Sequence, residues 1–160
     1  MNAPAPIADL LVAQTPDWHA PPEIRVGIDL VQVSRIAESL EQFGERFMAR
    51  LFTPGEIAYA NREPTLAAER FAARFAAKEA AIKALRLSDV DEAIDWRHIE
   101  VLRTTSGACD LVLHPQVARR AGRCSLSVSL SHEGDFATAV VVAQFAPLST
   151  TPTIDLKVTP

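Results

Sequence analysis

The chain has 160 residues, of which 48% are hydrophobic and 22% are charged, and its formal net charge is −4 at pH 7. This length supports one globular domain without disulfides, and the two cysteines, Cys109 and Cys124, have no metal-ligand spacing. The acidic charge balance disfavours nucleic acid as the main partner. No apolar run approaches the roughly 20 residues of a membrane-spanning helix, and the first twenty residues do not resemble a signal peptide. We therefore expect a cytoplasmic protein that binds neither nucleic acid nor membrane.

Prolines gather at the two ends of the chain, where eight of the eleven lie before Glu23 or after Ala146. Because proline removes a backbone donor and fixes φ, neither end can form a continuous helix or a central strand. We expect a flexible N-terminal extension over residues 1–22, one folded domain over residues 23–146, and a flexible C-terminal tail over residues 147–160.

The folded part begins with an apolar segment, EIRVGID, which predicts a strand over residues 23–29. Apolar residues at intervals of three and four then predict a helix over residues 31–43. In the next segment, Thr53 is a predicted N-cap, Pro54 a first helical residue and Glu56 the capping-box partner. A second, short helix should therefore start at this point.

The longest predicted element is a helix over residues 65–85, which are rich in alanine and contain neither glycine nor proline. The segments that follow predict a hairpin over residues 99–113, a short helix over residues 115–122 and a second hairpin over residues 124–145. Helices followed by strands in one chain indicate an α+β fold.

Two of the three lysines, Lys78 and Lys83, fall in the long predicted helix. Glu79 and Lys83 are four residues apart and share a face. An adjacent face carries a row of cations: Arg70, Arg74 and Lys78. One interpretation is an exposed helix with a Glu–Lys pair worth roughly 0.3–0.5 kcal/mol. The other is a functional site in which one carboxylate lies beside a strip of cations.

A second carboxylate, Asp29, stands where the first strand is predicted to end. Paired with Glu79, it can hold a hard cation such as Mg²⁺, which takes one or two protein carboxylates and completes its shell with water and substrate phosphates. The alternative for Asp29 alone is an N-cap for the helix that starts near Val31.

Hydroxyl groups line one face of the strand that precedes His132, because Ser127, Ser129 and Ser131 alternate with apolar residues there. Hydroxyl and imidazole groups suit the phosphate or ribose of a nucleotide, and a solvated strand face is an equally good interpretation. A serine hydrolase is disfavoured because the chain has no Gly-x-Ser-x-Gly elbow, and because Ser131 directly precedes His132 instead of standing at the spacing of a general-base pair.

Together these segments resemble the paired signature of 4′-phosphopantetheinyl transferases, and the small holo-acyl-carrier-protein synthase type is the closer match. The resemblance extends from about Arg25 to Gln144 and implies a fold in which an antiparallel sheet packs against a long central helix. It is carried by VGID at 26–29, Arg35, RLFTPGE at 50–56, Arg74, FAAKEAAIKA at 75–84 and SLSH at 129–132.

The resemblance implies Mg²⁺-dependent transfer of the phosphopantetheine arm of coenzyme A to a serine of an acyl carrier protein, with 3′,5′-ADP as the leaving group. Asp29 and Glu79 are the implied metal ligands. Glu79 and Lys83 are the catalytic candidates: Glu79 as general base, directly or through a metal-bound water, and Lys83 as acid or electrostatic stabiliser. Small family members are similar in being homotrimers with the active site at a subunit interface.

The same resemblance assigns the docking of the carrier protein to Arg35. It assigns coenzyme binding to Arg74, Lys78, Lys83, Ser131 and His132. Two alternatives stay open. One is a catalytically silent relative that binds coenzyme A or a carrier protein in a regulatory or structural role. The other is an unrelated Mg²⁺-dependent nucleotide pyrophosphatase that uses the same two carboxylates.

Overall fold

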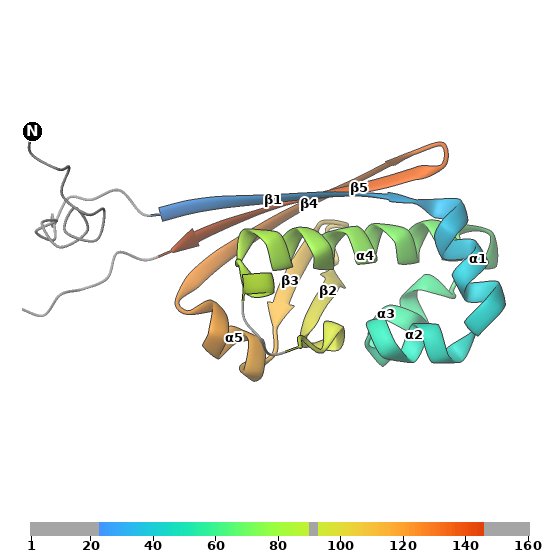
Figure 1. Ribbon diagram of the computed structural model, residues 1–160. Helices are drawn as coiled ribbons and strands as arrows, with labels where there is room; N and C mark the ends of the chain where they lie inside the picture. The colour runs from blue at the N-terminus through green and yellow to red at the C-terminus, as the bar shows by residue number, and fades with distance from the viewer. Residues whose placement is uncertain (1–22, 90–92, 146–160) are drawn as a thin grey trace, which may run out of the picture.

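The computed structural model describes residues 23–89 and 93–145. A long helix, α4 (Ala67–Ala84), lies against one face of a three-stranded antiparallel sheet (Figure 1). The strands of this sheet follow the order β1 (Glu23–Gln32), β5 (Phe136–Phe145) and β4 (Cys124–Glu133). The predicted α+β fold, with an antiparallel sheet packed against a long central helix, is confirmed. The two predicted flexible ends, residues 1–22 and 147–160, lie outside the described residues.

Shorter elements surround α4. Figure 1 shows three helices towards one end of α4, a separate two-stranded antiparallel hairpin beside it, and a last helix towards its other end. In chain order these elements are α1 (Val33–Phe43), α2 (Glu45–Leu51), α3 (Pro54–Ala60), β2 (Ile99–Arg103), β3 (Cys109–Leu113) and α5 (Pro115–Ala121). Three short 3₁₀ turns lie between them: η2 (Pro64–Leu66), η3 (Leu87–Asp89) and η4 (Trp96–His98). In the part of the chain that the structure describes, no helix is long and apolar enough to cross a membrane.

The predicted elements form: both hairpins span their predicted residues, and the first strand and the helices differ from their predicted bounds by a few residues at one or both ends. The Thr53 capping box of α3 is confirmed, since the Thr53 hydroxyl accepts from the Glu56 N–H and the Glu56 carboxylate accepts from the Thr53 N–H. The first strand runs three residues beyond its predicted end, because its last residues pair with β5 as far as Gln32, opposite Phe136. No pattern in the sequence predicts α2, because seven residues are too few to establish a period.

Small residues bring β1 and α4 into close contact. A Cβ atom built on Gly27 would lie only 1.9 Å from the backbone oxygen of Ala80 and 2.8 Å from the nitrogen of Ala84. Neighbouring alanines of α4, such as Ala77 and Ala81, are fully buried. The backbone of the first strand therefore rests directly on the helix, and the side chains that follow on β1 are held beside α4.

The opposite face of the three-stranded sheet, which we call the outer sheet face, carries exposed apolar side chains. On β1 these are Ile24, Val26, Ile28 and Leu30, each 61–63% exposed. Valines of β5 extend the apolar strip, and the serines of β4 border it, because the exposed positions of the three strands are in register. The predicted hydroxyl-lined strand face is confirmed as the β4 part of this surface.

Candidate functional site

Asp29 on β1 and Glu79 on α4 line the same pocket, although they are far apart in the sequence. The pocket has a volume of about 320 Å³ and is bounded by the end of β1, the first two turns of α1 and the middle of α4. Burial raises the pKa of Glu79, the negative charge of Asp29 raises it further, and Lys83 opposes both effects. The structure thus brings together the two carboxylates that the sequence pairs.

Lys83 lies beside this carboxylate pair. Its Nζ donates to Asp29 Oδ1 at 2.7 Å and to the carbonyl oxygen of Ile28 at 3.0 Å, and its side chain is 49% exposed. The alternative role of Asp29 as a helix N-cap is wrong. The helix α1 starts at Val33, its N-cap position is Gln32, and Oδ1 of Asp29 accepts from Lys83 and not from a helix N–H.

Glu79 also lines a second pocket, of about 600 Å³, between α2, α4 and the segment around η4. Arg97 in this pocket binds Asp95 with two hydrogen bonds of 2.9 and 2.6 Å, and this interaction lowers the pKa of Asp95 to about 2. Arg50 lines the same pocket and makes no ion pair with another described residue. Sequence reasoning did not name these arginines as site residues. For Arg50 there was a signal, since it stands in the RLFTPGE segment of the family resemblance.

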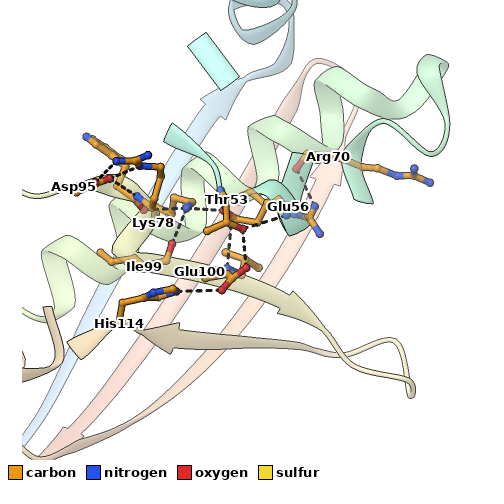
Figure 2. Close-up of polar contacts among 12 residues, drawn as sticks. Thr53, Glu56, Arg70, Lys78, Asp95, Ile99, Glu100 and His114 are labelled. Atoms are coloured by element: carbon orange, nitrogen blue, oxygen red, sulfur yellow. Dashed lines mark hydrogen bonds and ion pairs between the residues drawn. The ribbon is translucent and has the colours of Figure 1, made fainter. Parts of the chain in front are cut away.

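Lys78 has a different environment from the one expected of a phosphate ligand. Its side chain is fully buried, and its Nζ donates to Glu56 Oε2 at 2.8 Å, to the carbonyl oxygen of Trp96 at 3.0 Å and to that of Ile99 at 2.6 Å (Figure 2). Burial lowers the pKa of Lys78, and the charge of Glu56 opposes this effect. All three ammonium hydrogens are used, so this geometry leaves Lys78 no donor for a coenzyme phosphate.

Glu56 is the acidic half of this buried network. Besides Lys78, it accepts from the backbone N–H groups of Thr53 at 2.9 Å and Val101 at 3.0 Å. The hydroxyl of Thr53 donates in turn to Glu100, whose other oxygen lies 3.2 Å from the His114 imidazole (Figure 2). The network therefore ties α3, α4 and β2 together, and the hydrogen bond from Lys78 to Trp96 links it to a residue that lines the larger pocket.

Arg74 also faces away from Glu79. Only 5% of its surface is exposed, its guanidinium lies 4.2 Å from the centre of the Tyr59 ring, and its Nη1 donates to the carbonyl oxygen of Arg70 at 3.1 Å. Burial lowers the pKa of Arg74. Neither of the two pockets at Glu79 includes Arg74 in its lining. The row of cations predicted on α4 therefore lies mostly inside the protein.

Ser131 and His132 do not meet Glu79 within one chain. His132 Nδ1 lies 3.3 Å from the Glu69 carboxylate, and Glu69 precedes Glu79 by ten residues, which is about 15 Å along the helix. Ser131 lies on the outer sheet face, away from α4. Arg35, in contrast, lies in the first turn of α1 and lines the smaller pocket together with both carboxylates.

The donor set at the smaller pocket fits a hard divalent cation. Asp29 and Glu79 offer carboxylate oxygens in an open pocket. Burial, and after it the charge of Asp29, raise the pKa of Glu79, and a divalent cation beside the two carboxylates would offset both effects. Among residues 23–89 and 93–145, no group of three or more His, Cys, Asp or Glu side chains forms a richer metal site. Two carboxylates leave several coordination positions for water and substrate oxygens, which is the preference of Mg²⁺.

Comparison with known proteins gives a consistent result. The family model described as the 4′-phosphopantetheinyl transferase superfamily matches residues 25–141. The chain is 43% identical over 121 residues to the holo-[acyl-carrier-protein] synthase of Koribacter versatilis, a match that covers 74% of this chain and 95% of the relative. Its structure is similar to the Chronobacterium ammoniagenes ACPS–CoA complex, with a TM-score of 0.68 and 32% identity over 78% of this chain and 98% of that one. It is also similar to Helicobacter pylori holo-[acyl-carrier-protein] synthase in complex with coenzyme A, with a TM-score of 0.66 and 30% identity over 74% of this chain and 98% of that one.

Proposed function

The chain belongs to the 4′-phosphopantetheinyl transferase superfamily, within its holo-[acyl-carrier-protein] synthase group, and from this premise we propose that it transfers the 4′-phosphopantetheine group of coenzyme A to a serine of an apo acyl carrier protein. The observation that carries the proposal is the shared pocket of Asp29 and Glu79, with Lys83 in contact with Asp29. Two carboxylates and a cation are the groups that such a transfer needs, because its main difficulty is the charge on the phosphoryl oxygens.

In the proposed reaction, the serine oxygen attacks the phosphorus that carries the pantetheine arm. The bond from this phosphorus to the oxygen of 3′,5′-ADP breaks, and 3′,5′-ADP leaves. Glu79 takes the serine proton, because it is the carboxylate of this pocket that is not paired with Lys83. Lys83 stabilises the growing charge on the bridging oxygen, since two of its three hydrogens are used among the described residues and one is left.

We propose that Asp29 and Glu79 hold Mg²⁺. When bound, the ion supplies positive charge that polarises the phosphoryl group. The carboxyl group of Glu79 has two oxygens, and the proposal uses one for the metal and the other for the serine proton. Arg35, which lines the same pocket, is the proposed contact for an acidic carrier protein.

The proposed coenzyme set is Arg74, Lys83, Ser131 and His132, without Lys78. Arg74 lies away from Glu79, but unlike Lys78 it keeps a donor for a phosphate, because its Nε makes no hydrogen bond among the described residues. Because Ser131 and His132 lie away from Glu79 within one chain, we propose that a neighbouring copy supplies them in a homotrimer. The exposed apolar strip of the outer sheet face supports this proposal. It borders Ser131, and a contiguous row of exposed apolar side chains is typical of a surface that binds another protein chain.

The test is to incubate the full chain with coenzyme A, Mg²⁺ and a small panel of apo carrier proteins, and to measure the carrier mass. We expect the gain of one phosphopantetheine group on a carrier serine. Asp29→Asn and Glu79→Gln should each lower the rate at least about 100-fold, with unchanged circular dichroism. Asp110→Asn removes an exposed carboxylate that makes no hydrogen bond or ion pair among the described residues, and should keep the wild-type rate.

Other outcomes would point to the alternative functions. Release of 3′,5′-ADP from coenzyme A without any carrier present would indicate a pyrophosphatase. Binding of coenzyme A or of a carrier without turnover would indicate a silent relative. Full activity in either carboxylate variant would contradict the assignment of the metal site.

A further inference from the structure

We propose that Asp135, in the turn of the β4–β5 hairpin, is a positioning residue that holds the first turn of α1, and with it Arg35, in place for the carrier protein. This inference rests on the proposed function, because it concerns how the docking side chain is held. Asp135 itself lines neither pocket at Glu79, so it acts through α1 and not on the reacting groups.

The helix α1 has no capping group of its own. The first N–H groups of a helix have no partner inside the helix, and a side chain at the N-cap position commonly accepts from one of them. In α1 the N-cap residue is Gln32, whose side chain makes no capping hydrogen bond, and the first turn contains no acidic residue.

Asp135 supplies the missing acceptors from about one hundred residues further along the chain. Its carbonyl oxygen accepts from the N–H of Val33 at 2.8 Å, and its Oδ1 accepts from the N–H of Ser34 at 2.8 Å. Its Oδ2 accepts from the Ser34 hydroxyl and from the Gln32 amide, both at 2.8 Å. Figure 1 shows the turn of this hairpin at the same end of the molecule as the start of α1.

A carboxylate suits this position electrostatically as well. The N-terminus of a helix carries a partial positive charge, and an anion placed there stabilises the helix. The hydrogen bonds from Gln32 and Ser34 lower the pKa of Asp135, so the side chain is charged at neutral pH. These contacts could not be predicted from the sequence, because no short-range pattern relates residue 135 to a helix that starts at residue 33.

The first turn of α1 is also where the docking function is proposed. Arg35 follows Ser34 directly, and both Gln32 and Arg35 line the pocket that holds Asp29 and Glu79. Helix ends open more easily than helix centres, and a lost cap increases this opening. Without the Asp135 contacts, Arg35 would sample several positions, and a carrier protein would have to order it on binding.

The test compares Asp135→Ala with Asp135→Asn in the full chain. Asp135→Ala should raise the KM for the apo carrier about five- to tenfold, the effect of a lost cap on a binding equilibrium, with kcat and the KM for coenzyme A changed less than about twofold. Hydrogen exchange of the Ser34 amide, which loses its side-chain acceptor, should become faster, and that of the Val33 amide should change less, because its acceptor is the backbone carbonyl oxygen of residue 135. Asp135→Asn keeps one of the two acceptor oxygens but not the charge, and should give a KM between those of Asp135→Ala and the wild type. Glu133→Ala removes an exposed carboxylate of the same hairpin that makes no hydrogen bond or ion pair among the described residues, and should leave all of these quantities unchanged.

A double-mutant cycle with Arg35→Ala separates positioning from a general effect on stability. If Asp135 acts through Arg35, Asp135→Ala should change the carrier KM much less in the Arg35→Ala background than in the wild type. Equal changes in both backgrounds, or an unchanged carrier KM in an active Asp135→Ala enzyme, would overturn this inference alone. A wild-type chain that modifies no carrier in the panel would overturn the proposed function, and this inference with it.

Discussion

The surroundings of the Glu79 carboxyl group disfavour its ionised form. The group is partly buried between two pockets, and Asp29 adds a second negative charge nearby, which Lys83 only partly compensates. Such an arrangement suits a proton acceptor or a metal ligand, and it lowers the stability of the metal-free protein.

Glu79→Gln should therefore stabilise the metal-free protein while it removes activity. Because the pKa of Glu79 is higher in the folded state than in the unfolded state, the folded state binds the proton more tightly, and stability falls as pH rises through the folded-state pKa. Replacing the carboxyl group by an amide, which does not ionise, removes this pH-dependent loss of stability. With EDTA present, we expect Tm at pH 7 to rise by roughly 1–3 °C, and this difference to shrink as pH falls towards 4.5.

The control for this prediction is Glu38→Gln, which changes an exposed carboxyl of α1 and should leave Tm the same at both pH values. A lower Tm for Glu79→Gln at pH 7, or a difference that does not depend on pH, would contradict the assigned environment of Glu79.

At the scale of single residues, the sequence predicts which residues belong to the candidate site better than it predicts where their side chains lie. The pairing of Asp29 with Glu79 follows from their place in a recognisable signature, and the structure brings them into one pocket. The spacing of Arg74 and Lys78 shows that they share a helix face, but spacing alone does not show that this face is covered by α3 and β2. Lys78 is therefore buried in an ion pair that only the tertiary contacts reveal.

The contact between β1 and α4 decides how the site is assembled at the scale of elements. Asp29 follows Gly27 on β1, and Glu79 precedes Ala80 on α4, so the close approach of Gly27 and Ala80 fixes the two carboxylates relative to each other. A single side chain at position 27 would separate the two elements.

Gly27→Ala should lower the free energy of unfolding by at least about 2 kcal/mol, because the new Cβ would lie 1.9 Å from the Ala80 backbone oxygen and a backbone must move. Urea unfolding followed by circular dichroism measures this loss. The matched control is Gly55→Ala in α3, where the nearest atom is 3.4 Å away on the Glu100 side chain, and where we expect a change below about 1 kcal/mol. Equal effects of the two substitutions would show that the close approach does not constrain β1.

The buried ion pair of Lys78 and Glu56 links α4 to α3 and leads to a second prediction about stability. Lys78→Met leaves the Glu56 carboxylate and two backbone carbonyls buried without their donor, and should cost about 3–5 kcal/mol in urea unfolding. Lys83→Met, five residues further along the same helix, removes a pair in which the lysine is half exposed, and should cost clearly less, about 1 kcal/mol.

A double variant makes this prediction sharper. Lys78→Met combined with Glu56→Gln should lose clearly less than the sum of the two single losses, because each single change leaves its partner's charge unpaired. Additive losses would mean that the two side chains do not depend on each other.

Elements with a strong local signal could be predicted from the sequence, but the order of the strands in the sheet could not. The alanine-rich helix and the capping box of α3 follow from short-range rules. The helix forms with slightly shifted ends, and the capping box forms at the predicted residues. The order β1-β5-β4 joins the first strand of the domain to the last two, a pairing without a local signal. The same reason explains why Asp135 as a cap of α1 could not be predicted.

For the whole molecule, the outer sheet face leads to a prediction about assembly. Ile28→Glu places a charge within the apolar strip, and burying a charge in an interface is costly. If copies of the chain associate through this face, light scattering should give three times the mass of one chain for the wild type and about the mass of a single chain for Ile28→Glu, with unchanged circular dichroism. The control is Phe43→Glu, which changes an exposed apolar residue on α1, outside the outer sheet face, and should keep the wild-type mass.

The pairing of β1 with β5 also determines when this protein can fold during its synthesis. Glu23 lies opposite Phe145, so the first strand waits for nearly the whole domain to leave the ribosome before it gains a neighbour. Until then, no complete sheet covers the alanine face of α4. Nascent chains halted before residue 136 should therefore be sensitive to protease and should bind chaperones.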